Sequence, residues 1–279
     1  MALQWFPGHM NSTRRAITEA LPTKDVLIEV LDARMPASST NPVLTELRQD
    51  KPCIKLLTKG DLADPVVTEP WVLKLRAEHA GDRVLAVALG KTRPADIRNR
   101  ITQLCKELAP QRTGSKSVRV LVVGIPNVGK STLINLLMDR KVAKVGDEPA
   151  VTKAPQLVTL KNGMTISDNA GILWPRMDDQ ATLRLALGGA LPDTAMEYER
   201  VALFGAELLL ARYPDLVCAR FKLDSPPASP RALLESIGRS HGCLRSGGCV
   251  DLYKAADVFV HEFRAGKLGR ISLEAPGDS

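Results

Sequence analysis

The amino-acid sequence predicts an α/β domain with a mostly parallel sheet and helices on both faces, followed by a smaller all-helical domain. Three observations support this fold class. In the first two thirds of the chain, short apolar runs alternate with helical patterns. After about residue 180, only helical patterns recur. The apolar fraction of 44% over 279 residues is sufficient to bury a core. We expect the first domain over residues 1–184 and the second over residues 185–279.

Four short, mostly apolar runs of the first domain, rich in β-branched residues, are predicted to be parallel strands, because strands that alternate with helices form a sheet covered on both faces. They cover residues 26–31, 53–57, 84–87 and 118–123. The spacing between them predicts helices over residues 41–48, 69–79 and 94–108. Two further runs, 156–160 and 164–167, are separated by Lys161-Asn162-Gly163 and predict a hairpin with a tight turn.

The second domain is predicted from helical spacing alone. Its four helices are expected over residues 181–191, 194–212, 229–239 and 250–266. In the first domain, the polar and turn-rich segment 110–117 is predicted to be a connector between the third helix and the fourth strand.

Positive charge is concentrated in the middle of the chain. Residues 91–161 contain fourteen Lys and Arg against five Asp and Glu, a net charge of +9, whereas the whole chain has +7, which leaves −2 for the remainder. This distribution favours a polyanionic partner such as a nucleic acid. The alternative is a solvated surface that includes a few phosphate-binding lysines.

The composition also bears on location. No run approaches the roughly 18 consecutive apolar residues of a membrane span, and residues 1–10 lack the pattern of a signal peptide. The five cysteines are scattered, without Cys-x-x-Cys spacing, which is typical of free thiols in a reducing compartment. We expect a cytoplasmic protein with no membrane partner.

The segment 124–131, Gly-Ile-Pro-Asn-Val-Gly-Lys-Ser, fits the pattern G-x-x-x-x-G-K-[ST]. It follows the predicted strand 118–123 and opens a predicted helix over 131–138, which is the context that a phosphate-binding P-loop requires. Lys130 is expected to reach the β- and γ-phosphates, and Ser131 to bind Mg²⁺. The residues expected to hold the nucleotide phosphates are Asn127, Val128, Gly129, Lys130, Ser131 and Thr132.

A second phosphate element is predicted at Asp168-Asn169-Ala170-Gly171, at the end of the hairpin. The Asp168 carboxylate at a strand end is suited to the Mg²⁺ shell, and the Gly171 N–H is suited to the γ-phosphate. In the loop between this element and the P-loop, Thr152 is the candidate switch threonine for Mg²⁺ and the γ-phosphate. The alternative for Thr152 is an ordinary loop residue.

The base-binding element is predicted at Thr58-Lys59-Gly60-Asp61, directly after the strand 53–57. The Asp61 carboxylate is suited to accept hydrogen bonds from N1–H and the 2-amino group of guanine, and adenine offers neither donor. The stem of Lys59 is expected to cover the base. The next strand ends at Ala88-Leu89-Gly90, where a backbone N–H is suited to guanine O6.

The order of these elements is unusual for a GTPase, because the base-binding elements precede the phosphate loop by about 65 residues. A circularly permuted chain closes the same sheet if its old termini are joined, and the segment 110–117 is the predicted joint. The first domain is therefore predicted to be a circularly permuted P-loop GTPase domain.

With these motifs in this order, the chain resembles the circularly permuted GTPases that act in ribosome assembly. The resemblance covers nearly the whole length. Besides the nucleotide motifs, it includes Trp5-Phe6-Pro7-Gly8-His9-Met10, the stretch 30–36 and segments between Gly242 and Ile271. It implies a GTPase that binds GTP or GDP with Mg²⁺, binds ribosomal RNA and assists late assembly of the large ribosomal subunit. The resemblance also makes the second domain a helical RNA-binding module; we expect a monomer that does not bind DNA.

Two positions depart from the family pattern. The usual base motif Asn-Lys-x-Asp has Thr58 in place of Asn, and the usual Ser-Ala of the following loop is replaced by Ala88-Leu89. Both changes are expected to weaken guanine affinity, although the Thr58 hydroxyl is suited to tie neighbouring loops. Neither change removes the discriminating Asp61.

The resemblance also bears on hydrolysis. Apolar Ile172 and Leu173 follow Gly171, where Ras-type enzymes have a Gln that orients water. The family implies K⁺ as a charge stabiliser, bound in part by Asn127; the alternative is that Asn127 caps its own backbone. His9 is a candidate for positioning water, and the alternative is that it anchors the N-terminal segment or contacts RNA.

The leading functional hypothesis is a GTPase switch, with catalytic roles for Lys130, Asn127, Thr152, Gly171 and His9. Two alternatives belong to other classes. One is a P-loop enzyme that transfers phosphate to a small molecule. The other is an RNA-binding assembly scaffold whose affinity is set by the nucleotide.

Overall fold

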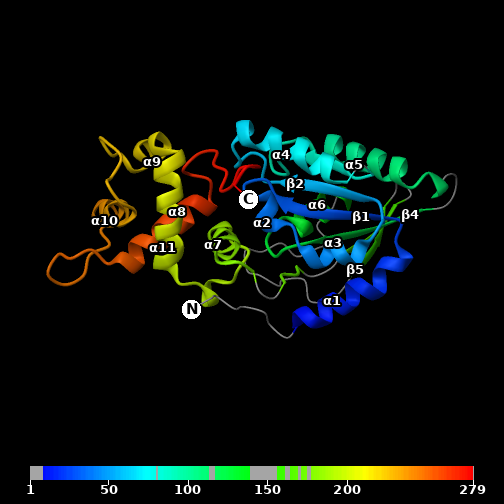
Figure 1. Cartoon of the computed structure of the whole chain (residues 1–279), viewed down its shortest axis with the longest axis horizontal. Coiled ribbons are helices and arrows are strands. Elements are labelled where there is room, and N and C mark those ends of the chain that lie inside the picture. The colour runs from blue at the N-terminus through cyan, green and yellow to red at the C-terminus, as the bar shows by residue number, and fades with distance from the viewer. Residues whose placement is uncertain are drawn as a thin grey trace. The chain divides into compact units, whose positions relative to one another are not determined.

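The computed structural model describes residues 9–79, 81–112, 117–138, 156–160, 164–168, 171–174 and 177–278. The chain folds into two compact units (Figure 1). The helical unit covers Met177–Leu273, and the nucleotide-binding unit contains the described residues before it together with the C-terminal tail from Glu274. The boundary predicted after residue 184 lies inside helix α7 (Asp179–Gly188).

The nucleotide-binding unit is built on a six-stranded sheet with the order β3-β2-β1-β4-β6-β5. All neighbouring pairs are parallel except β5 with β6, which pair antiparallel as predicted, while the predicted tight turn at 161–163 lies outside the described residues. The strands are β1 (Val26–Asp32), β2 (Cys53–Thr58), β3 (Arg83–Ala86), β4 (Val118–Gly124), β5 (Gln156–Thr159) and β6 (Met164–Asp168). Every residue of β1 and β2 is buried, as expected for central strands covered on both faces. The predicted α/β class is confirmed.

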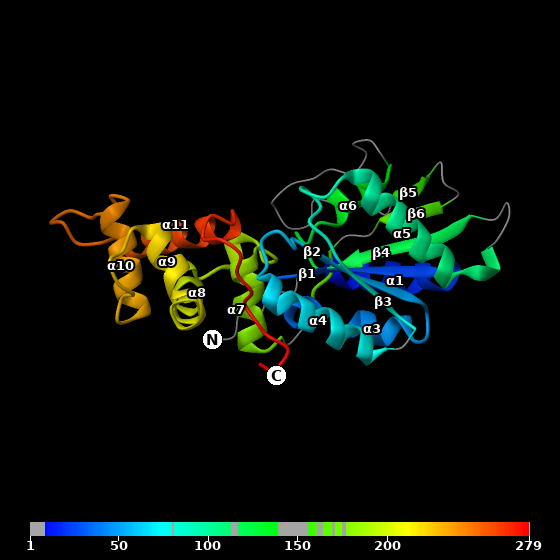
Figure 2. The same cartoon turned by 90° about the horizontal axis from the view of Figure 1, so that it is seen from above.

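Helices cover both faces of this sheet (Figure 2). One face is covered by α1 (His9–Ala20), α3 (Pro42–Arg48) and α4 (Pro65–Glu78). Ile17 of α1 and Leu44 of α3 share a core cluster with Leu27 and Leu121 of the sheet. The opposite side is covered by α5 (Pro94–Leu108) and α6 (Lys130–Met138). The carboxyl ends of the parallel strands are thus free to carry the loops that hold the motifs.

Some helices differ from their predictions. Helix α4 begins at Pro65 and not at residue 69, because Asp64 caps it by accepting a hydrogen bond from the Val66 N–H. Three helices were not expected: α1, α2 (Pro36–Ser39) and α9 (Pro214–Phe221). Four residues are too few to show a helical period, so α2 left no pattern in the sequence.

The helical unit consists of α7 to α11. Besides α7 and α9 these are α8 (Tyr198–Arg212), α10 (Pro230–Ser240) and α11 (Leu252–Arg264). Helix α8 packs against α7, α10 and α11. At Gly205 a Cβ atom would lie 2.9 Å from side chains of Leu187 and Phe259, so glycine permits this close approach. Among the residues that the structure describes, no helix combines the length and apolar character needed to cross a membrane.

The C-terminal tail packs on the nucleotide-binding unit, although the sequence assigned residues 274–279 to the helical domain. The indole N–H of Trp71 donates to the Glu274 carbonyl at 3.1 Å, and Lys74 Nζ donates to the Pro276 carbonyl at 2.9 Å. Both donors lie on α4. The chain therefore returns from the helical unit to the nucleotide-binding unit after Leu273.

A buried carboxylate fixes the end of the predicted joint. Asp25, directly before β1, accepts hydrogen bonds from the N–H and guanidinium of Arg119 at 2.9–3.1 Å and pairs with Arg112 at 3.1 Å. Arg112 ends the short helix η2 (Pro110–Arg112), and residues 113–116 lie outside the described part of the chain. Burial opposes ionisation, but the bonds from both arginines outweigh it and lower the pKa of Asp25 to about 2.

The Asp25→Asn variant should be less stable than wild type at pH 7 by about 2 kcal/mol, because the arginines stabilise the native carboxylate enough to lower its pKa from near 4 to about 2. Since the native pKa is depressed, this stabilisation is present above the unfolded pKa near 4 and is lost as the pH falls toward 2. Urea unfolding of both proteins between pH 7 and pH 3 measures the difference. A gap that stays constant or widens over this range would contradict the assignment.

Candidate nucleotide-binding site

The predicted P-loop connects β4 to α6. Gly124 ends β4 beside β1, where a Cβ atom would lie 2.4 Å from the Val30 carbonyl oxygen, so only glycine fits. Asn127 and Gly129 both have positive φ, 54° and 101°. Such a loop turns consecutive backbone N–H groups toward one concavity, and the N-terminus of α6 adds positive potential. This is the backbone arrangement that an anion such as a phosphate requires.

Lys130 begins α6 and is 7% exposed. Its Nζ donates to the Ile125 carbonyl at 2.6 Å, so the ammonium lies within the loop and not in solvent. Ser131 and Thr132 follow in the first turn and are partly exposed. The side chains expected to serve the phosphates and Mg²⁺ are therefore placed at the helix start.

Gly171 lies directly on the phosphate loop. A Cβ atom at this position would lie 2.6 Å from Pro126 N and 3.0 Å from Lys130 Nζ. The next residue keeps Gly171 against the loop, because the Ile172 N–H donates a hydrogen bond to the Gly124 carbonyl at 3.2 Å. Asn41 Nδ2 in turn donates to the Ile172 carbonyl at 3.1 Å. The structure thus brings the glycine of D-x-x-G to the phosphate loop, and its contact with the γ-phosphate stays a prediction.

The other phosphate-side candidates are only partly described. Asp168 ends β6 in register with Val122 of β4, but its side chain lies outside the described atoms. Thr152 lies outside the described residues altogether. His9 is the first residue of α1, and its side chain is likewise not described. Their predicted roles therefore stay predictions.

The predicted base-binding segment contacts the phosphate loop through Thr58. Its hydroxyl lies 2.6 Å from the Val128 carbonyl and 3.0 Å from the Leu31 carbonyl, so it ties the end of β2 to both the P-loop and β1. A Cβ atom at Gly129 would lie 3.4 Å from Leu89 Cδ1 and 3.7 Å from Thr58 Cγ2. Segments separated by some 70 residues in sequence thus form one continuous site.

The remaining base-side residues lie in two adjoining loops. The Gly60 N–H donates to the Val87 carbonyl at 3.1 Å, which joins the K-x-D turn to the loop that carries Ala88. Asp61 is partly exposed, with its Oδ2 3.6 Å from Lys91 Nζ at the surface. A carboxylate in this position is open to a ligand.

The sequence patterns did not assign a role to Asp32, which ends β1. Its Oδ2 lies 2.8 Å from Lys59 Nζ and 2.8 Å from Arg34 Nη2, and Arg34 Nε donates to Oδ1 at 3.0 Å. Burial disfavours the carboxylate, but the two cations outweigh it and hold the pKa of Asp32 below its ordinary value. The available signal was an acidic residue at the end of a mostly apolar strand, in which Glu29 is the other acidic residue.

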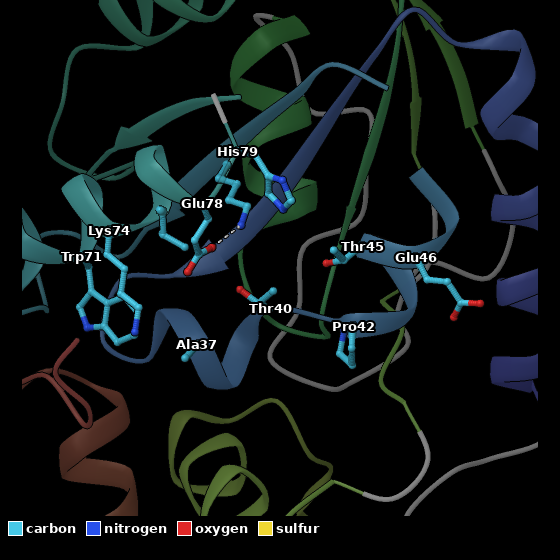
Figure 3. Close-up of a pocket in the computed structure, with 11 residues that line it drawn as sticks. Ala37, Thr40, Pro42, Thr45, Glu46, Trp71, Lys74, Glu78 and His79 are labelled. Carbon is cyan, nitrogen blue, oxygen red and sulfur yellow. Dashed lines mark hydrogen bonds and ion pairs between the residues drawn. The ribbon is translucent and has the colours of Figure 1, made fainter. Parts of the chain in front are cut away.

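A separate cavity lies between α2–α3 and α4 (Figure 3). Its volume is about 590 Å³, and the Lys55–Glu78 ion pair, with a distance of 3.3 Å, lines it. None of the predicted nucleotide-binding residues lines this cavity. The nucleotide motifs and the cavity are therefore different features of the unit.

The site suits a metal ion that is bound mainly by the phosphates of the nucleotide and only in part by the protein. Among the described residues, no group of three or more His, Cys, Asp or Glu side chains is placed to hold an ion. Mg²⁺ in nucleotide sites is typically bound by one or two hard oxygen ligands together with the phosphates. The Ser131 hydroxyl at the start of α6 offers a hard oxygen of this kind. Nothing in this donor set conflicts with the predicted Mg²⁺ site.

The phosphate loop, the glycine packed against it and the tied K-x-D segment define a P-loop GTPase domain in which the base elements come first, a circular permutation. A family model described as 50S ribosome-binding GTPase matches residues 119–202. The chain is 39% identical to ribosome biogenesis GTPase A of Bacillus licheniformis, over 100% of both chains. It is 32% identical to the protein of that name from Thermotoga maritima, over 99% of this chain and 95% of that one. The chain therefore belongs to the ribosome biogenesis GTPase A family.

Solved structures agree with this assignment. GNP-bound YlqF from T. maritima is 29% identical, with a TM-score of 0.68 over 96% of this chain and all of that one. A GDP-bound structure of YlqF gives the same TM-score, with 28% identity over 95% of this chain. The same fold is thus known with GNP and with GDP bound.

The Gly171→Ala variant should bind a GTP analogue about tenfold more weakly, because the added methyl group collides with backbone atoms of Pro126 and with the Lys130 ammonium; such overpacking typically costs about 1–3 kcal/mol. Affinity for GDP should fall less, since the Gly171 N–H is expected to serve the γ-phosphate. Fluorescent nucleotide titration measures both affinities.

The matched control is Gly81→Ala, where an added Cβ meets nothing within 4 Å. Both nucleotides should bind this variant as they bind the wild type. Equal affinities for Gly171→Ala and Gly81→Ala would contradict the placement of Gly171 on the phosphate loop.

Proposed function

We propose that this protein is a GTP-binding and GTP-hydrolysing switch that binds ribosomal RNA and assists late assembly of the large ribosomal subunit. The observation that carries the proposal is the Thr58 contact with Val128, which joins a guanine-reading segment to a phosphate loop. The relatives supply the biological setting, since they are named for ribosome biogenesis and the matching family model is described as 50S ribosome-binding. We place the protein in the cytoplasm as a monomer, without DNA or a membrane as partner.

The proposed roles follow the sequence motifs. Lys130 stabilises charge on the β- and γ-phosphates, and Asp61 selects guanine over adenine. Ser131, Asp168 and Thr152 are the proposed protein ligands of Mg²⁺, which neutralises phosphate charge when bound. Backbone N–H groups from Asn127 to Thr132 hold the phosphates, and the loop at Ala88 meets guanine O6.

Hydrolysis requires a charge stabiliser other than a glutamine after the D-x-x-G motif. Ile172 and Leu173 are each 1% exposed, so neither orients a water molecule. We propose that Asn127 contributes its side-chain oxygen to a K⁺ site, where the ion supplies positive charge near the β–γ bridge. The left-handed backbone at Asn127 is consistent with a residue held for such a purpose. His9 remains the candidate for positioning water.

The charge distribution supports a division of labour in RNA binding. Residues 177–273 contain twelve Lys and Arg and twelve Asp and Glu, so the helical unit has no formal net charge. Residues 91–112 of the other unit contain six basic and two acidic side chains. We propose that the nucleotide-binding unit supplies the salt-dependent attraction to phosphates and that the helical unit supplies selectivity.

The chain connectivity supports a switch. Only residues 172–176 separate Gly171 from the start of the helical unit at Met177. A contact of Gly171 with the γ-phosphate therefore acts close in sequence to the connection between the units, and the loss of this contact on hydrolysis releases that segment.

The two alternative functions are weighed differently. Membership of the ribosome biogenesis GTPase A family disfavours an enzyme that transfers phosphate to a small molecule. A scaffold that uses nucleotide only to set affinity differs in one respect: its assembly function would survive in a variant that binds GTP without hydrolysing it.

The protein should sediment with large-subunit particles more tightly in a non-hydrolysable GTP analogue than in GDP, and this association should weaken steeply with salt. Lys130→Ala, which removes the phosphate-binding ammonium, should lose the difference between the nucleotides. Equal sedimentation in both nucleotide states would refute the switch, even for a competent GTPase.

Potassium should stimulate GTP hydrolysis over sodium by at least about tenfold at equal ionic strength, since removal of one charge-stabilising donor typically costs about 100-fold or more. Asn127→Gly should abolish the difference, because glycine keeps the left-handed backbone but has no side-chain oxygen. Phosphate release assays in both salts make the comparison. Equal turnover of the wild type in the two salts would count against the ion mechanism.

A further inference from the structure

The ammonium of Lys59 is held by a buried ion pair. Asp32 and Arg34 are 1% and 2% exposed, whereas the side chain of Lys59 is 25% exposed. Asp32 thus contacts two cations: Arg34, which is enclosed by the protein, and Lys59, which is partly exposed and belongs to the predicted base-binding segment. Arg34 also donates its backbone N–H to Asp32 Oδ1 at 3.0 Å, which fixes the carboxylate plane.

The loop after β1 holds Asp32 in place. The Asp32 N–H donates to Ser39 Oγ at 3.0 Å, and Ser39 Oγ lies 2.8 Å from the Met35 carbonyl. Ser39 is fully buried and ends helix α2. The position of the carboxylate therefore depends on α2, a helix of four residues that cannot be stable alone.

Helix α2 is held from outside by the C-terminal tail. The Glu274 carboxylate accepts hydrogen bonds from the N–H groups of Ala37 and Ser38 and from Ser38 Oγ, the last at 2.6 Å. Glu274 is 3% exposed. Ala37 and Trp71, which Figure 3 shows on different elements around the cavity, both hydrogen-bond to Glu274.

We propose that Asp32 and Glu274 are positioning residues of the guanine site, which act by fixing the side chain of Lys59. The proposal rests on the guanine-nucleotide binding proposed above. A lysine whose ammonium is already held presents its methylene stem in one arrangement, so less side-chain freedom is lost when a base packs on it. Immobilising one flexible side chain typically changes affinity by a few-fold to about tenfold.

The tail thereby acts on the nucleotide site through α2 and Asp32, although it lies far from the nucleotide motifs in sequence. Glu274 follows Leu273, the last residue of the helical unit, and contacts the loop that holds Asp32. Guanine affinity should therefore respond to changes in the tail. Asp61, which reads the guanine edge, should keep its selectivity.

The test is a double-mutant cycle on GDP affinity, measured with a fluorescent GDP analogue. Asp32→Asn should weaken binding about tenfold, and Lys59→Met, which keeps the stem but removes the ammonium, should do the same. The double variant should bind no more weakly than the weaker single one. Multiplied losses in the double variant would show that Asp32 does not act through Lys59 and would overturn the proposal.

Two further variants keep the test decisive. Since Asp32→Asn leaves the buried Arg34 guanidinium without its carboxylate, the cycle is repeated with Asp32→Asn and Arg34→Gln together. Glu274→Gln places an amide N–H₂ against N–H donors and should weaken GDP binding about threefold in the wild type but not in the Asp32→Asn background. Unchanged GDP affinity in folded Glu274→Gln would remove the tail from the proposal.

The matched control is Glu262→Gln. Glu262 is also a buried carboxylate in ion pairs, with Arg220 and Lys267, but it lies in the helical unit. Its loss should lower the thermal midpoint without changing GDP affinity. If the wild-type protein fails to prefer GDP over ADP, the proposed function itself fails. If that preference holds and the cycle is additive, only the positioning role fails.

Discussion

The contact between the Thr58 hydroxyl and the Val128 carbonyl is the interaction on which the nucleotide site depends. It joins the end of β2, which leads into the predicted base-binding turn, to the predicted phosphate loop. The same hydroxyl lies near the Leu31 carbonyl, so β1 is included in the joint. Without this hydrogen bond, the base and phosphate segments would be connected mainly by the pairing of their strands in the sheet. An asparagine is usual at this position in the resembling family, and the shorter threonine here still reaches both carbonyls.

The strand order explains why one contact is sufficient. In the strand order, β1 lies between β2 and β4, so the base-reading half and the phosphate half of the sheet share a central parallel pair. Gly124 approaches the Val30 carbonyl at the carboxyl end of this pair, and Asp25 joins its opposite end to Arg119. The order of elements along the chain has changed, but the edge of the sheet at which ligands bind has not. The fold therefore brings the base-binding and phosphate-binding motifs to one edge of the sheet, although their order along the chain is permuted.

Local sequence patterns predicted most of the sheet and the order of the motifs. The strands, their antiparallel pair and α5 follow from apolar runs and from helical spacing, which are short-range features. Helix α2 and the tail could not be predicted in this way. Four residues carry no period, and the Glu274 contact joins residues 236 apart in sequence. The role of Asp32 was missed for a related reason, since its partner Lys59 directly follows the neighbouring strand and only the register brings them together.

The most direct test of this joint is the affinity of Thr58→Val for GDP. Valine has nearly the same shape as threonine but cannot donate to the Val128 carbonyl, and an unpaired buried carbonyl typically costs about 1–3 kcal/mol. Isothermal titration should show GDP binding weakened by about tenfold or more in a variant whose circular dichroism matches that of the wild type. An affinity within about twofold of the wild type would contradict the claim that this hydroxyl joins the two halves of the site.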